Sequence, residues 1–98
     1  MICVKILGIK TFLRYSSRRI VVAAEQTLLE EYPNLELNIT EIINYEEIEK
    51  YTNVLIAPGL VINEKLVYDI WIPKKEQVIG WLREAIQEQD NTSNEIIP

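Results

Sequence analysis

The side chains with the clearest chemical potential are the basic residues near the N-terminus. Residues 1–24 contain five Lys and Arg residues and no acidic residue, although the 98-residue chain has a net charge of −5. Guanidinium groups bind carboxylates, phosphates and sulfates through charge-assisted hydrogen bonds. The segment is therefore a candidate site for an anion or an acidic partner within an otherwise acidic protein. Its basic residues are Lys5, Lys10, Arg14, Arg18 and Arg19.

The residues that the chain lacks narrow the catalytic possibilities. It has no histidine and one cysteine, Cys3. These counts exclude Ser-His-Asp triads, imidazole acid–base catalysis and zinc sites of the Cys/His kind. A free cysteine in a strand usually behaves as a small buried hydrophobic residue, and we interpret Cys3 in this way. We identify no catalytic pair of carboxylates and expect neither a metal nor a cofactor.

The basic residues lie where a predicted strand is followed by a predicted helix. The strand is apolar on both faces, which is typical of an inner strand covered by helices, and residues 9–15 form the predicted connection. Ser16 or Ser17 is the predicted N-cap of the helix. The helix is predicted to end near Tyr32, because Pro33 disfavours the helical conformation in the residue before it. Unpaired N–H groups at the start of this helix would favour an anion.

The remaining patterns complete one α/β domain over residues 1–88, followed by a polar tail over 89–98 that we predict to be disordered. The two residues 63–64 form the predicted turn of a hairpin. The order β-α-β-α-β-β-α predicts a three-layer sandwich with a four-stranded mixed sheet and helices on both faces. The predicted strands cover 2–7, 35–42, 53–57 continuing as 60–62, and 65–70, and the predicted helices cover 16–32, 44–51 and 76–87.

This order of elements resembles that of the thioredoxin-like family. The segment IAPGLVINEKLV at 56–67 resembles the part of that fold that carries its cis-proline, and IPKKEQV at 72–78 resembles the start of the last helix in small archaeal and bacterial thioredoxin-like and glutaredoxin-like redox proteins. The resemblance covers roughly residues 1–88. It implies a cis bond between Ala57 and Pro58, and a backbone at Ala57 that pairs with an extended peptide.

The chain departs from the family at the redox motif Cys-x-x-Cys. Counting from Gly8 puts Thr11 and Arg14 at the two cysteine positions, whereas counting back from the end of the helix puts Tyr15 and Arg18 there. Both alignments remain open, and neither supplies a thiol. Because dithiol–disulfide exchange needs an attacking thiolate and a resolving thiol, the chain is predicted not to perform it alone.

Three functional interpretations follow from these observations. The first is a redox-inactive thioredoxin-like module that binds a protein, a peptide or an anion through residues 10–19 and the Pro58 loop, by analogy with the small circadian-clock thioredoxin-like proteins. The second is an oxidoreductase relative that acts with a partner, in which Cys3 forms an intermolecular disulfide. The third is an enzyme for an anionic substrate that uses serine or tyrosine in place of cysteine. The candidate binding residues are Lys10, Thr11, Phe12, Arg14, Tyr15, Ser16, Ser17, Arg18, Arg19, Ala57 and Pro58.

A simpler interpretation of the basic segment also stays open. Its cations would then form a solvated surface that pairs with Glu25, Glu30 or acids elsewhere. Phe12, Leu13 and Tyr15 either pack under the connection or form an exposed rim for a protein partner, and Trp71 raises the same question.

The sequence argues against nucleic acid and membranes as partners. The basic patch is small, the rest of the chain is acidic, and two aromatic residues make a thin platform for base stacking. No apolar run approaches the roughly 20 residues that span a bilayer, and the start of the chain does not resemble a secretory leader. We therefore expect a cytoplasmic protein; its oligomeric state stays open.

Overall fold

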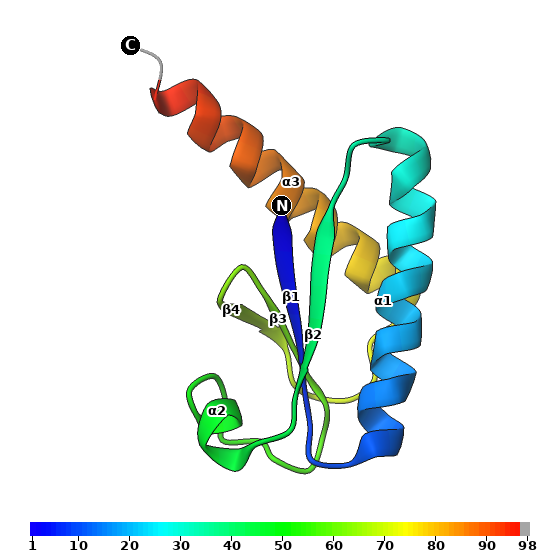
Figure 1. Cartoon of the computed structure of the whole chain (residues 1–98), viewed down its shortest axis with the longest axis vertical. Coiled ribbons are helices and arrows are strands. Elements are labelled where there is room, and N and C mark those ends of the chain that lie inside the picture. Colours follow the sequence, from blue (N-terminus) through cyan, green and yellow to red (C-terminus); the bar gives the residue numbers. More distant parts are fainter. Residues whose placement is uncertain (97–98) are drawn as a thin grey trace.

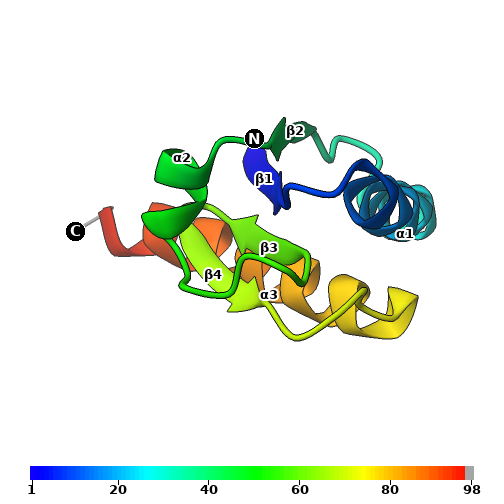
Figure 2. The ribbon, with the colours of Figure 1, turned by 90° about the horizontal axis from the view of Figure 1, so that it is seen from below.

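The computed structural model describes the backbone of residues 1–96 and the side chains of residues 1–89. A four-stranded mixed sheet carries α1 and α3 on one face and α2 on the other (Figures 1 and 2). This arrangement confirms the predicted α/β class and the predicted order of elements. In chain order the elements are β1 (Ile2–Leu7), α1 (Thr11–Glu31), β2 (Leu37–Ile42), α2 (Tyr45–Glu49), β3 (Gly59–Ile62), β4 (Lys65–Tyr68) and α3 (Lys75–Ile96).

The sheet is built around β1, which contributes side chains to a hydrophobic cluster on each face of the sheet. The strand order is β2-β1-β3-β4, with β1 parallel to β2 and antiparallel to β3. Ile2, Val4 and Ile6 point into the main core beneath α1 and α3, which explains why β1 is apolar. On the opposite face, Leu7 packs with Ile48 of α2. Burial on both faces identifies β1 as the inner strand that its composition predicted.

The hairpin between β3 and β4 forms as predicted. Asn63 and Glu64 have φ angles of 49° and 68°. Two consecutive residues in the left-handed region match the twist of a two-residue hairpin turn. Asn63 also accepts a hydrogen bond from the Cys3 N–H through its side-chain oxygen, at 3.0 Å, so the turn is fastened to the start of β1.

A polar cluster holds the segment after α2 against the sheet. Lys5 Nζ donates to the Tyr51 hydroxyl at 2.9 Å and binds Glu64 Oε1 at 2.5 Å, and the Tyr51 hydroxyl donates to Glu64 Oε2 at 2.6 Å. These hydrogen bonds lower the pKa of Glu64 below its usual value and raise the pKa of Lys5. Lys5 and Glu64 therefore both carry their charges near neutral pH, and the cluster positions the start of the connection between α2 and β3.

The start of α1 differs from the prediction. The helix begins at Thr11, so residues 11–15 are helical and neither Ser16 nor Ser17 is its N-cap. Leu13 and Arg14 are buried at these early positions, and burial of that face extends the helix toward the N-terminus. The helix ends before Tyr32, as predicted from Pro33.

Three other predictions about the backbone need correction. Residues 53–57 form no strand, because β1 ends at Leu7 opposite Gly59 and offers no partner to earlier residues. No peptide bond in residues 1–96 is cis, so the bond between Ala57 and Pro58 is trans and the cis prediction is wrong. The last helix ends at Ile96 rather than near 87 and covers most of the predicted tail, whose residues 97–98 lie outside the described residues.

A substitution at Ser17 tests the packing of α1. Its side chain is 1% exposed, and the hydroxyl oxygen has no hydrogen-bond partner. Burial of an unpaired hydroxyl is unfavourable, and alanine has the higher helix propensity. We therefore expect Ser17→Ala to raise the free energy of unfolding by about 1 kcal/mol in urea denaturation. Ser16→Ala is the control and should change it less, whereas a destabilised Ser17→Ala protein would contradict this account.

Candidate functional site

The candidate site lies at the end of the sheet where β1 and β2 finish. Leu7 pairs with Ile42 at this end, and Gly59 at the start of β3 lies opposite Leu7. The connections that follow β1, β2 and β4 therefore meet here, at the bottom of Figure 1 and facing the viewer in Figure 2. We call this region the loop end and define it as residues 8–19, 43–58 and 69–75.

Arg14 is buried at the base of the loop end. It is 9% exposed, and its guanidinium donates to the Gly8 carbonyl at 2.9 Å, to Glu41 Oε1 at 3.1 Å and to Thr11 Oγ1 at 3.5 Å. One side chain thus joins the end of β1, the first turn of α1 and the end of β2. Because the guanidinium is buried and makes three hydrogen bonds inside the fold, Arg14 is a structural residue rather than a free anion-binding group.

Glu41 also binds Arg18. Its second carboxylate oxygen accepts a hydrogen bond from the Arg18 guanidinium at 3.1 Å. Two of the predicted binding cations therefore pair with one acid from the neighbouring strand. The Arg18 side chain is 44% exposed, so solvent screens this ion pair more than that of Arg14.

Gly8 packs closely against both Arg14 and Pro58. A Cβ atom added to Gly8 would lie 3.0 Å from Arg14 Cγ and 3.9 Å from Pro58 Cα, so a larger residue at position 8 would require Arg14 to shift. Ala57 and Pro58 are both buried. The Pro58 loop therefore supports the loop end from beneath, and its two predicted binding residues do not form the outer surface.

A hydrogen bond joins two of the loops. The buried Thr52 donates from its hydroxyl to Asp69 Oδ2 at 2.7 Å and accepts from the Val54 N–H at 2.9 Å. The connection before β3 and the one after β4 are thereby held together. This link gave no signal in the sequence, since the two residues belong to different predicted elements.

Exposed apolar side chains gather at the loop end. Phe12 is 74% exposed and Tyr15 is 60% exposed, whereas Leu13 between them is buried. Trp71 is 51% exposed, so these three aromatic residues belong to the rim considered from the sequence and do not pack beneath it. Of the ten large apolar side chains exposed in residues 1–89, eight belong to the loop end, and only Met1 and Val22 lie elsewhere. The eight are Phe12, Tyr15, Ile43, Tyr45, Val54, Ile56, Ile70 and Trp71.

Charged residues border this apolar surface on two sides. In the N-terminal half of α1 and at the start of α3, four exposed cations have no ion-pair partner in the described part of the chain: Lys10, Arg19, Lys74 and Lys75. One exposed acid, Glu76 in the first turn of α3, lies beside them. On the α2 side the exposed acids are Glu46, Glu47 and Glu49, of which Glu47 binds Lys50 at 3.5 Å.

The residues proposed as replacements for cysteine are differently placed. Ser17 is buried, Ser16 is half-buried and Tyr15 is exposed. Cys3 is near the start of β1, opposite the loop end, and is half-buried. In the described residues no three Cys, Asp or Glu side chains are grouped to hold a metal ion. Nor does that part of the chain contain a helix with the length and hydropathy to cross a membrane.

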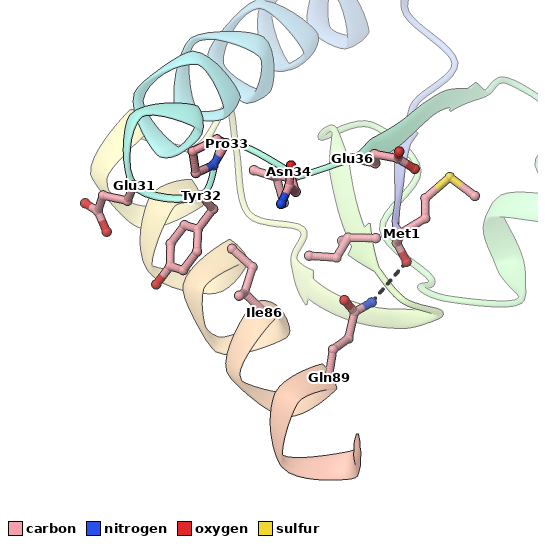
Figure 3. A pocket seen from close by; sticks show the side chains of 10 residues that line it. Met1, Glu31, Tyr32, Pro33, Asn34, Glu36, Ile86 and Gln89 are labelled. Atoms are coloured by element: carbon pink, nitrogen blue, oxygen red, sulfur yellow. Dashed lines mark hydrogen bonds between the residues drawn. The ribbon is translucent and has the colours of Figure 1, made fainter. Parts of the chain in front are cut away.

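A cavity of about 440 Å³ opens at the other end of the molecule, between the end of α1, the start of β2 and α3 (Figure 3). Ile2, Tyr32, Leu35 and Ile86 give it an apolar wall. At its edge Gln89 donates to the Met1 carbonyl at 3.0 Å, and Glu31 binds Arg83. None of the predicted site residues lines this cavity.

Comparison with protein-family models, with curated proteins and with solved structures finds no match. The function of this chain must therefore be argued from its own geometry.

Arg14 and Arg18 provide a matched test of the loop-end base, because both bind Glu41. Arg14→Gln leaves the Gly8 carbonyl and Glu41 without a buried charged partner, and we expect a loss of about 2 kcal/mol in the free energy of unfolding. Arg18→Gln removes an exposed ion pair and should cost less than about 1 kcal/mol. Urea denaturation of the two variants measures both values. Equal losses would contradict the structural role of Arg14.

Proposed function

We propose that this chain is a redox-inactive thioredoxin-like module that binds a protein partner through the loop end. The observation that carries the proposal is the gathering of eight exposed apolar side chains on one end of the molecule. Monomeric soluble proteins rarely expose large contiguous apolar patches unless the patch has a partner. Aromatic and arginine side chains such as Trp71, Tyr15 and Arg19 are also the types enriched at energetically important interface positions.

The topology supports the thioredoxin-like part of the proposal. In the resemblance drawn from the sequence, the redox motif follows the first strand and opens the first helix. Here α1 begins at Thr11, directly after β1, so Thr11 and Arg14 occupy the first turn of that helix. This favours the alignment counted from Gly8 over the one that uses Tyr15 and Arg18. The trans bond before Pro58 departs from what the resemblance implies.

The chemistry of Arg14 supports the redox-inactive part. In the alignment counted from Gly8, the position of the second thiol is held by a buried guanidinium bound to Gly8 and Glu41. The alternative based on Cys3 would place its chemistry at the other end of β1. The serine-based alternative loses Ser17, whose hydroxyl is buried beneath the helix.

Cysteine substitutions test the thioredoxin-like interpretation. We expect Thr11→Cys/Arg14→Cys to form an intramolecular disulfide and to accelerate the reduction of insulin by dithiothreitol, because it restores both thiols at the start of the helix. Wild type should give the rate of dithiothreitol alone, and the matched variant Tyr15→Cys/Arg18→Cys should do the same. Turnover by wild type would contradict redox inactivity. A folded but inactive Thr11→Cys/Arg14→Cys protein, checked by circular dichroism, would contradict the alignment.

Affinity capture from cell extract tests the binding surface. We expect Phe12→Ser/Trp71→Ser to lose proteins that immobilised wild type retains, because two exposed aromatic anchors are removed. Val22→Ser is the control, since Val22 is an exposed apolar residue of α1 outside the loop end. Quantitative mass spectrometry compares the three proteins. Identical captured sets would remove the loop end from the proposed function.

A further inference from the structure

We infer that the loop end binds a second copy of this chain in a symmetric dimer. The inference rests on the proposed function, because it identifies the protein partner of the same surface. Three features of the loop end carry it: a basic side, an acidic side and an apolar surface between them.

The two charged sides come from different elements. Lys10 directly precedes α1 and Arg19 is the ninth residue of that helix, whereas Lys74 directly precedes α3 and Lys75 is its first residue. The acids of α2 lie across the loop end from them, as Figure 2 shows in its view onto this end: α2 lies on one side and the beginnings of α1 and α3 on the other. The loops with the exposed Ile56, Ile70 and Trp71 run between them.

A surface with this pattern is complementary to itself. Consider a twofold axis that lies in the interface, at right angles to the line from the basic side to the acidic side. This axis would place the basic side of one protomer on the acidic side of the other. The same rotation would bring the apolar middle of one copy against that of its partner. Symmetric interfaces of this kind use one patch twice and combine an apolar centre with a charged rim.

The charge pattern favours a second copy over partners of uniform charge. An acidic peptide or a nucleic acid would bind the cations of α1 and α3 but would be repelled by Glu46 and Glu49 of α2. A basic partner would meet the reverse problem. Only a partner that places acids against the cations of the loop end and cations against the acids of α2 is complementary to both sides. A second copy of the chain carries both kinds of charge in this arrangement. Glu46 and Glu49 have no ion pair in the described residues, so their charges are available.

Analytical ultracentrifugation of charge-reversed proteins tests the dimer. We expect wild type to associate reversibly, and to do so more weakly in high salt because the rim charges are screened. Lys74→Glu/Lys75→Glu makes the basic side acidic, and Glu46→Lys/Glu49→Lys makes the acidic side basic. Each alone should weaken the dimer at least about tenfold, because like charges face each other. An equimolar mixture should associate again, since the altered charges then complement each other.

Two variants with charge reversals outside the loop end are the controls. Lys65→Glu on β4 reverses a positive charge and Glu30→Lys on α1 reverses a negative charge. Both residues lie outside the loop end, so each variant should associate as wild type does. At a protein concentration of about 500 μM, even a weak dimer would be detected. A wild-type protein that stays monomeric at this concentration would overturn the inference of a dimer. So would a dimer that the charge reversals do not weaken, or a mixture that fails to associate. A monomeric wild type whose capture of other proteins still depends on Phe12 and Trp71 would overturn the dimer while leaving the proposed function intact.

Discussion

The contacts of Arg14 are the constraint on which the loop end depends. A guanidinium buried among β1, α1 and β2 must have its donors satisfied, and the Gly8 carbonyl and Glu41 supply acceptors at 2.9 and 3.1 Å. These bonds hold the first turn of α1 against the ends of two strands. They also bring Arg14 close to Gly8, where an added Cβ atom would lie 3.0 Å from Arg14 Cγ. The most buried part of the candidate site is therefore rigid, and its charge is neutralised within the fold.

The same constraint determines which side chains face the solvent. Leu13, Arg14 and Ser17 lie on the sheet-facing side of α1 and are buried. Because a helix turns about 100° per residue, Phe12 and Tyr15 then point away from the sheet. Their exposure follows from the burial of their neighbours, and helix formation from Thr11 makes it unavoidable. The exposure of these two aromatic side chains is in this sense a consequence of the anchoring of Arg14.

The sequence predicted features that depend on local pattern and missed those that depend on distant partners. The inner strand, the turn at Asn63 and the end of α1 before Pro33 were predicted because each has a local signal. The strand predicted at 53–57 does not form, because strand formation there depends on where β1 ends. Glu41 was not singled out, since an acid in an alternating strand looks solvent-exposed until α1 is placed beside it. The gathering of the exposed apolar side chains at one end likewise requires the topology.

The distribution of charge shows how folding changes what a partner meets. Along the sequence, the first 24 residues form a basic segment. In the fold, Lys5 binds Glu64, while Arg14 and Arg18 share Glu41. Only Lys10 and Arg19 of that segment remain without an ion pair in the described structure, and the nearby cations at the start of α3 come from a distant part of the sequence. The basic side of the loop end is thus assembled by the topology, and the proposed interface depends on this assembled surface rather than on the basic N-terminal segment.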